Sequence, residues 1–378
     1  MYDVIVIGAG PCGLSISKEL LNNNLDVLLL EEHKEVGIPR HCTGVVSSSM
    51  IKLVGNAAER SIINKIKRAK FVSPHGYSFD IYFDEYVTFI LDRILFEQLL
   101  LKDVEEKGAS ILFNKRVNKI DIQKDKVNVF TNNECFISKF VVCASGPTTN
   151  IVEEYHPPFS FPSIQYEIEG NIEEQDKVDL VFVKEAKNFF LWQAPTSNST
   201  FLIGLGNKKE NPKKSLDKYL SRNKITGKIR AVYSGRIIYD YPVRDPIIRN
   251  RVIVIGDAAG HSKSTTGGGL FYGLLSSKIA GKYISEYLTT GNDNYLLELK
   301  NVQEKYINKE LRNTHRCAEI FYNLPLAYYD LIFKKLSTIN FKDLLNPEDQ
   351  DHHIWAILKM FKNPSVIFRI IKDLFMQQ

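Results

Sequence analysis

Cysteine is scarce in this 378-residue chain, and its spacing excludes several kinds of site. The five cysteines stand at positions 12, 42, 135, 143 and 317, with no C-x-x-C pair among them. An odd number of scattered cysteines argues against a disulfide framework, an iron–sulfur cluster or a zinc site, and favours a reducing compartment. We therefore expect no metal centre.

Long apolar runs are also missing. No uninterrupted apolar segment reaches the roughly 18 residues that a membrane-spanning helix needs. A buried strand is predicted from residue 3 onward, which leaves no room for a signal peptide. We expect a cytoplasmic protein, with peripheral contact to a membrane as an open alternative.

Neither sign of charge is in large excess. The 49 Lys and Arg residues against 44 Asp and Glu residues give a net charge of +5, which is compatible with an anionic ligand or a membrane surface. No basic run is interleaved with aromatic residues, so we expect no nucleic-acid partner. The length exceeds that of a usual single core and predicts two interlocked domains.

A glycine motif opens the chain. An apolar strand over residues 4–7 runs into Gly8, Gly10 and Gly13, and a helix-like stretch follows over 14–21. In such a turn the first glycine allows the tight bend, the second lets the backbone approach a pyrophosphate, and the third lets helix pack on strand. The N-terminus of the helix adds unpaired N–H groups for the phosphates. The segment therefore predicts a dinucleotide site.

Two carboxylates complete this unit. A second apolar strand over residues 26–30 ends in Glu31 and Glu32, about 20 residues after the glycines. This is the spacing at which an acidic residue accepts hydrogen bonds from ribose hydroxyls. Glu31 is the better candidate and Glu32 is its neighbour.

Three later elements identify the dinucleotide. The first, over 251–260, is again strand then turn, with Gly256 and Asp257, and it leads into Gly267, Gly268, Gly269 and a helical stretch over 270–288. The second is the helix-like segment 92–100, which contains Arg93, and the third is a short strand that ends in Ala144-Ser145-Gly146. Together they resemble the FAD fingerprints of the flavoprotein hydroxylase-like superfamily. The resemblance implies that Asp257 binds the ribityl chain, that the glycines face the pyrophosphate and flavin, and that Arg93 reaches the phosphates. A surface ion pair between Arg93 and Glu97 is the alternative.

This resemblance implies an α/β fold: a Rossmann-like FAD domain, a second domain with an antiparallel sheet, and a C-terminal helical region. We predict a discontinuous FAD domain over 1–70, 86–155 and 246–295, with a β-meander over 110–145. The substrate domain is predicted over 71–85 and 156–245, and the helical region over 296–378. Strands are expected near 163–168, 178–183, 188–192, 201–205 and 228–238, and helices near 295–320, 328–336, 353–361 and 365–375.

Two further regions discriminate among flavoenzymes. One is the loop over 34–47, which holds Arg40, His41 and Cys42. The other is the aromatic stretch over 189–195, with Phe190, Trp192 and Pro195, followed by 201–206, which ends in Gly206. Both resemble the geranylgeranyl reductase family, as does the closing segment 263–273. The resemblance implies that Arg40 and Cys42 lie at the cofactor, and that Phe190, Trp192, Pro195 and Gly206 line a lipid cavity. The sequence departs from the family at Phe190, Ala194 and Ser264, which leaves the identity of the isoprenoid open.

The predicted reaction is the saturation of carbon–carbon double bonds of geranylgeranyl chains of a lipid precursor, with hydride from reduced FAD. It requires a proton donor, and Cys42 is the first candidate, with His41 beside it. The alternative for Cys42 is a small buried hydrophobe, and the alternative for Trp192 and Phe190 is packing in a sheet core.

The competing function is an FAD-dependent monooxygenase or halogenase acting on a smaller aromatic substrate. A single tryptophan in 191–195 argues against the halogenase branch. A non-catalytic role for the FAD is a third hypothesis. No second glycine fingerprint marks a nicotinamide domain, so ferredoxin and NAD(P)H both remain as electron donors. The amphipathic segments 324–336 and 354–375 suit either an interfacial helix near anionic lipid or docking onto the protein's own core.

Overall fold

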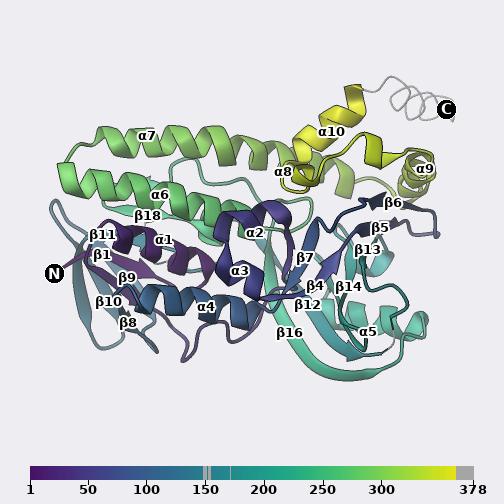
Figure 1. Cartoon of the computed structure of the whole chain (residues 1–378), viewed down its shortest axis with the longest axis horizontal. Helices are drawn as coiled ribbons and strands as arrows, with labels where there is room; N and C mark the ends of the chain where they lie inside the picture. Colours follow the sequence, from purple (N-terminus) through teal and green to yellow (C-terminus); the bar gives the residue numbers. More distant parts are fainter. Residues whose placement is uncertain (148–150, 152–154, 171, 363–378) are drawn as a thin grey trace.

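The structure contains two large β-sheets and a small third one, and helices pack against both large sheets (Figure 1). The computed structural model describes residues 1–147, 151, 155–170 and 172–362. The segment predicted as a helix over 365–375 lies outside these residues. In Figure 1 the first sheet lies at the left and the second at the right. The α/β fold expected from the sequence is confirmed.

The first sheet has a parallel centre. Its strand order is β17 (Ile247–Ile248), β18 (Val252–Val254), β11 (Cys135–Cys143), β1 (Tyr2–Ile7), β2 (Val27–Leu30) and β8 (Ser110–Leu112), and β9 (Val117–Ile122) and β10 (Val127–Thr131) extend it from β11. The last three strands of the segment 110–145 form the predicted meander, but β8 does not join it. It pairs in parallel with β2 instead, because the helix before it returns the chain to the far edge of the sheet.

Alternate side chains of β1 pack into two different hydrophobic cores, one on each face of the sheet. Val4 and Val6 pack with the helices α1 (Pro11–Asn22), α4 (Arg93–Glu105) and α6 (Leu270–Thr290), whereas Ile5 and Ile7 pack toward the meander. Burial on both faces is what a parallel strand requires, and it explains the unbroken apolar run at the N-terminus. The carboxyl end of β1 is thereby held rigidly at the glycine turn.

The second sheet has the order β16 (Lys228–Ile238), β12 (Ser160–Glu169), β15 (Thr200–Gly206), β14 (Leu191–Ser197), β13 (Lys177–Val181), β5 (Arg68–Val72) and β6 (Ser78–Tyr82). It is antiparallel except for β13 beside β5. Strand β5 enters this sheet slightly before the predicted boundary at residue 71. The strand expected over 188–192 begins only at Leu191, because Asn188 adopts a left-handed backbone conformation (φ 64°) that interrupts an extended chain.

The third sheet and the remaining helices connect these parts. The small sheet has the order β3 (Val45–Ser47), β7 (Thr88–Leu91) and β4 (Ile62–Ile66). The other helices are α2 (Ser48–Val54), α3 (Asn56–Arg60), α5 (Pro212–Arg222), α7 (Asn294–Gln303), α8 (Lys309–Tyr322), α9 (Leu326–Leu336) and α10 (His353–Lys362), with short turns η1 (Lys184–Ala186), η2 (Gly256–Ala259), η4 (Phe341–Asp343) and η5 (Pro347–Gln350). The single helix expected over 295–320 is interrupted by a π-helical turn, η3 (Glu304–Asn308).

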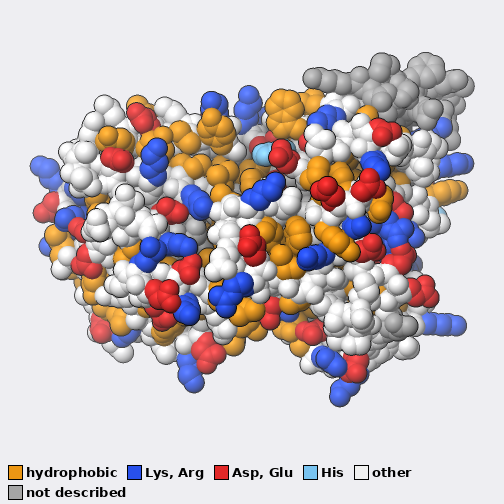
Figure 2. Space-filling model, viewed as in Figure 1, with side chains coloured by type: hydrophobic (Ala, Val, Ile, Leu, Met, Phe, Trp, Pro, Cys, Tyr) orange, Lys and Arg blue, Asp and Glu red, His pale blue; other side chains and the backbone are white. Residues whose placement is uncertain are grey.

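The C-terminal helices dock onto the second sheet. Tyr329, Phe333 and Leu336 of α9 are buried in one aromatic cluster with Phe79 of β6 and Phe182. Of the two alternatives for segment 324–336, docking onto the protein's own core is therefore what this face of α9 does. Among the described residues no helix is both long and apolar enough to cross a bilayer. Positive and negative side chains alternate over the face shown in Figure 2.

Candidate active site

One cavity of about 1570 Å³ runs between the two large sheets and under the C-terminal helices. It exceeds the roughly 300–1,000 Å³ of an ordinary ligand pocket, so it has room for a cofactor and a second ligand. It is lined by most of the residues that the sequence singled out: Gly8, Gly10, Glu31, Glu32, Arg40, His41, Cys42, Arg93, Ala144, Gly146, Phe190, Trp192, Gly256, Asp257, Gly267, Gly268 and Gly269. Gly13, Pro195 and Gly206 are not among the lining residues.

The first glycine turn is a cradle with an open side. A Cβ on Gly13 would lie 1.9 Å from the Gly8 carbonyl oxygen, and one on Gly8 would lie 2.6 Å from that of Ala144. A Cβ on Gly10 or on Gly146 would meet nothing within 4 Å. Gly8 and Gly13 are thus required by packing within the protein, whereas Gly10 leaves space that a pyrophosphate could occupy. The cradle fits a dinucleotide.

Glu31 and Glu32 differ in what they face. Glu31 is buried at the end of β2, where its Oε2 accepts a hydrogen bond from the Ala9 N–H (2.7 Å) and its Oε1 accepts one from the His33 N–H (2.9 Å). Glu32 is exposed and lies 3.6 Å from Arg116. Glu31 is therefore the carboxylate fixed beside the cradle, and its contact with ribose stays a prediction.

Replacing Glu31 with glutamine is expected to weaken FAD binding roughly 10- to 100-fold, because a charge-assisted hydrogen bond to the ribose would be lost. The Glu32→Gln variant should bind FAD within about twofold of the natural protein, because Glu32 already faces solvent and Arg116. Fluorescence titration of the apoproteins with FAD measures both constants. Equal losses in the two variants would contradict the assignment of Glu31.

The second fingerprint packs against the first at Cys12. Asp257 follows β18 in η2, and a Cβ on Gly269, at the start of α6, would lie 2.9 Å from its Oδ1. Burial raises the pKa of the Asp257 carboxyl, and the positive charge of Arg93 opposes that change. Cys12 fills the space left by two further glycines: its Sγ would lie 2.9 Å from a Cβ on Gly256 and 2.6 Å from one on Gly273. Packing is a sufficient reason for Cys12.

Arg93 combines features of both predictions made for it. It forms the expected i,i+4 ion pair with Glu97, but the pair is buried rather than on the surface. Burial opposes the charge of the guanidinium, while Glu97 and Cys42 raise the pKa of Arg93. Its buried Nε has no hydrogen-bond partner in the described part of the chain. A buried cation with an unused donor at the cavity wall fits a negatively charged group, such as a phosphate.

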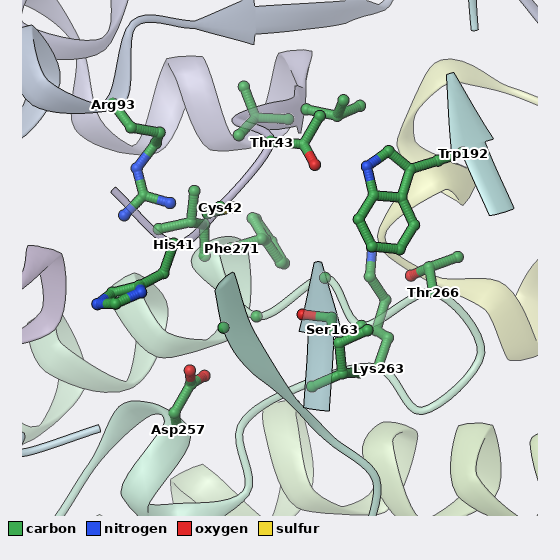
Figure 3. A pocket seen from close by; sticks show the side chains of 18 of the residues that line it. His41, Cys42, Thr43, Arg93, Ser163, Trp192, Asp257, Lys263, Thr266 and Phe271 are labelled. Atoms are coloured by element: carbon green, nitrogen blue, oxygen red, sulfur yellow. The ribbon is translucent and has the colours of Figure 1, made fainter. Parts of the chain in front are cut away.

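The loop that contains Cys42 is held by both halves of the molecule. Arg40 donates to the carbonyl oxygens of Cys42 and Thr43 (both 3.2 Å) and lies over the ring of Tyr233. His41 Nδ1 lies 2.7 Å from the Ser234 carbonyl oxygen. In Figure 3 the guanidinium of Arg93 points toward Cys42, and the His41 ring points away from Trp192. Cys42 is thus the better placed of the two predicted proton-transfer residues.

Trp192 lines the cavity, and its indole ring packs over Gly204. Its Nε1 donates to Gln165 Oε1 (3.4 Å), which also accepts a hydrogen bond from the Thr43 hydroxyl (2.7 Å). A Cβ on Gly204 would lie 2.6 Å from Trp192 Cζ2 and from the Ile164 carbonyl oxygen. Gln165 therefore connects the Cys42 loop to Trp192, and Gly204 gives the indole its place. Sequence reasoning missed both residues, although a glutamine in the apolar stretch 161–166 was a detectable signal.

Beside Trp192 the cavity is lined by aromatic rings, in a region that we call the aromatic chamber. It is lined by Phe71, Phe79, Phe182, Phe190, Phe321, Phe333 and Phe341. The rings contact one another from sheet to helix: Phe79 stacks on Phe71 (4.8 Å between centroids) and meets Phe333 of α9 edge-on (5.0 Å). Phe190 and Trp192 both line this side, 6.2 Å apart.

Two predicted lining residues lie elsewhere. Pro195 is buried on β14 and its carbonyl oxygen accepts a hydrogen bond from Asn64 (2.8 Å). Gly206 lies beneath Phe161 and Phe189, which would be 2.6 and 3.2 Å from an added Cβ. Both support the sheet behind the chamber and do not face its interior.

Comparison with known proteins agrees with this site. The model of a family described as the FAD binding domain matches residues 1–302. The chain belongs to this FAD-binding family. FAD is accordingly its cofactor, and the two glycine turns, Glu31, Arg93 and Asp257 are the residues that would hold it.

Several relatives of this FAD-binding protein cover nearly its whole length. An uncharacterised protein of Methanocaldococcus jannaschii is 29% identical, over 99% of this chain and 98% of the other. A protein of Methanosphaera stadtmanae named digeranylgeranylglycerophospholipid reductase 2 is 26% identical, over 91% of this chain and 93% of its own. A geranylgeranyl bacteriochlorophyll reductase-like protein from Thermoplasma acidophilum shares the fold, with a TM-score of 0.85, 18% identity and 99% of each chain covered. The predicted resemblance to geranylgeranyl reductases is confirmed.

His261, on the loop after η2, is expected to make the free energy of unfolding depend on pH in the acid range. It is 1% exposed, and burial lowers its pKa to about 4. Between pH 6.5 and 4 the unfolded chain binds a proton that the folded chain does not, so the free energy of unfolding should fall by about 3 kcal/mol across this range. A His261→Gln variant should lack that decrease. Urea unfolding at pH 7, 5.5 and 4 measures the difference, and parallel pH profiles would contradict it.

Proposed function

We propose that this protein is an FAD-dependent reductase that saturates carbon–carbon double bonds in the geranylgeranyl chains of a lipid precursor. The observation that supports this most directly is the continuity of the cavity from the FAD cradle into the aromatic chamber. An isoprenoid chain is long and apolar, and such a chamber can enclose it while one double bond lies at the flavin. The names of the relatives support the same substrate class.

The chemistry accounts for the lining of the chamber. Reduced FAD, when bound, supplies a hydride to one alkene carbon, and the other carbon needs a proton. No carbonyl stabilises an isolated alkene during this transfer, so positive charge develops on the more substituted carbon. The aromatic side chains exclude water that would capture this carbon, and their ring faces attract positive charge.

Cys42 is the proposed proton donor. It borders the cavity between the FAD cradle and Trp192, and Arg93 lies beside it. Loss of a proton from the thiol leaves a negative charge that the neighbouring guanidinium would stabilise. His41 is held against Ser234 and would at most assist. The electron donor, either ferredoxin or NAD(P)H, and peripheral contact with a membrane belong to this proposal as well.

The test is anaerobic. The purified protein is photoreduced, mixed with a geranylgeranylated phospholipid, and followed by flavin absorbance and product mass. Flavin reoxidation with mass gains in steps of two hydrogens would support the proposal. A flavin that stays reduced with lipid, but reoxidises with oxygen and hydroxylates or halogenates an aromatic compound, would overturn it in favour of the competing function.

Replacing Cys42 with alanine is expected to slow lipid-dependent flavin reoxidation on the order of 100-fold, because a general acid contributes about that much or more. FAD binding should be unchanged. The matched control is Cys135→Ala, since Cys135 is exposed on β11 and is not among the residues that line the cavity. A Cys42→Ala protein that turns over at the natural rate would exclude the thiol as the proton donor.

A further inference from the structure

The segment before α10 crosses back to the FAD site. We call residues 346–353 the strap. One of its residues, Asp351, is 3% exposed. The Asp351 Oδ1 accepts a hydrogen bond from Lys263 Nζ (3.0 Å), its Oδ2 accepts one from the Ser47 hydroxyl, and its backbone carbonyl oxygen accepts one from the Tyr272 hydroxyl (2.8 Å). The strap is thus fixed to the loop that carries Lys263, to the N-terminus of α2 and to α6.

Lys263 carries the opposite charge, on the loop that runs into Gly267, Gly268 and Gly269, the glycines expected to face the flavin. It is 6% exposed, and its Nζ also donates to the Gln350 carbonyl oxygen (2.7 Å). Its backbone closes the loop: Lys263 N–H donates to Gly268, and Gly267 N–H donates to Lys263. A Cβ on Gly268 would lie 3.3 Å from Lys263 Cε. The Lys263 side chain therefore packs directly against the glycine segment that lines the cavity, and Figure 3 shows Lys263 among the residues of that cavity.

A second contact between strap and loop is uncharged. His353 Nε2 lies 2.9 Å from the Gln350 carbonyl oxygen, which can only accept, so Nε2 carries the proton. Nδ1 then accepts a hydrogen bond from the Thr265 hydroxyl (2.5 Å). Burial lowers the pKa of His353 to about 3, so the ring is neutral at physiological pH. Glu310 of α8 is a further acidic group near Lys263, and its carboxylate accepts a hydrogen bond from the Ile354 N–H (2.9 Å).

We propose that Lys263 and Asp351 form a balanced charge pair that sets the reduction potential of the FAD bound beside Gly267, Gly268 and Gly269. Reduction by two electrons and one proton leaves the flavin with one negative charge. A nearby buried cation stabilises that charge, and a nearby anion destabilises it. Because the strap supplies the anion, the segment that follows the chamber-lining residues Phe333 and Phe341 would also tune the flavin. Lys263 and Asp351 are positioning residues in this proposal and not catalytic ones.

The test is the potential of the bound flavin, measured anaerobically against a redox dye. Asp351→Asn leaves the cation unbalanced and should raise the ratio of reduced to oxidised flavin about tenfold at a fixed potential, which is about 30 mV for a two-electron couple. Lys263→Met leaves the anion unbalanced and should lower that ratio by a similar factor. The double variant should return close to the natural value, and Lys263→Arg, which keeps the charge, should stay there.

Shifts of opposite sign in the two single variants would not follow from a merely structural role, since loosening the loop would move both in the same direction. If a single variant does not retain FAD, the charge-reversed pair Lys263→Asp/Asp351→Lys keeps an ion pair and should lower the potential. Single-variant shifts of equal sign, no shift, or an unchanged potential in the charge-reversed pair would overturn the proposal. The measurement needs no lipid, so it is independent of the outcome of the reductase test. Only the relevance of the potential to turnover rests on the proposed function.

Discussion

Replacing Gly13 with alanine is expected to abolish FAD retention and to lower the free energy of unfolding by about 3 kcal/mol or more. The added methyl group would lie 1.9 Å from the carbonyl oxygen of Gly8, a backbone atom that cannot rotate away. Helix α1 would have to move off β1, and the N–H groups at its N-terminus would move with it. Urea unfolding and the flavin absorbance of the purified variant measure the two effects.

Gly10→Ala is the matched control, because it changes the same turn with the opposite steric consequence. Nothing lies within 4 Å of the added methyl group, so the apoprotein should keep its stability within about 0.5 kcal/mol. FAD affinity should still fall about 100-fold, because the methyl group occupies space assigned to the pyrophosphate. An apoprotein as damaged by Gly10→Ala as by Gly13→Ala, or an unimpaired affinity for FAD in the Gly10→Ala protein, would contradict this reading of the turn.

The FAD half of the site was predictable because its information is local. Gly8, Gly10, Gly13 and Glu31 lie within one β-turn-α-β unit, where spacing alone fixes what each residue can face. The structure adds which glycine serves packing and which leaves space. It also shows that the Arg93–Glu97 pair is buried. The sequence could not indicate this, because burial depends on which distant segments of the chain pack against α4.

The second half of the site depends on contacts between distant segments. The aromatic chamber joins Phe79 to Phe333, and the strap joins Asp351 to Ser47, about 250 and 300 residues apart. No periodicity in either segment encodes such a pairing. Pro195 and Gly206 were assigned to the cavity by resemblance, and alternation along a strand does not show which face meets a cavity until the neighbouring layers are known. Phe190 and Trp192 reach the cavity side together, although Phe190 precedes the strand.

Replacing Gly204 with alanine is expected to slow lipid-dependent flavin reoxidation on the order of 100-fold while FAD binding is retained. The methyl group would lie 2.6 Å from the Trp192 ring, the Gln165 Cβ and the Ile164 carbonyl oxygen. Trp192 must therefore leave its place, or Gln165 must release the hydroxyl of Thr43 and with it the Cys42 loop. Small displacements of positioning groups cost about this factor, and the FAD cradle lies on another sheet.

Gly170→Ala, at the residue that directly follows β12 of the same sheet, provides the comparison. Its methyl group would lie 3.2 Å from Phe201 Cε1, part of a side chain that can shift, and 3.9 Å from the Thr226 carbonyl oxygen, an ordinary van der Waals contact, so turnover should stay within about twofold. Anaerobic reoxidation of the photoreduced proteins gives the rates, and FAD fluorescence titration gives the affinities. If Gly204→Ala lost FAD as well, the second sheet would support cofactor binding and not only the substrate. If the Gly204→Ala protein reduced lipid at the natural rate, the hydrogen bonds that join Thr43, Gln165 and Trp192 would have no part in positioning the alkene. The isoprenoid chain would then have to reach the flavin along another side of the chamber.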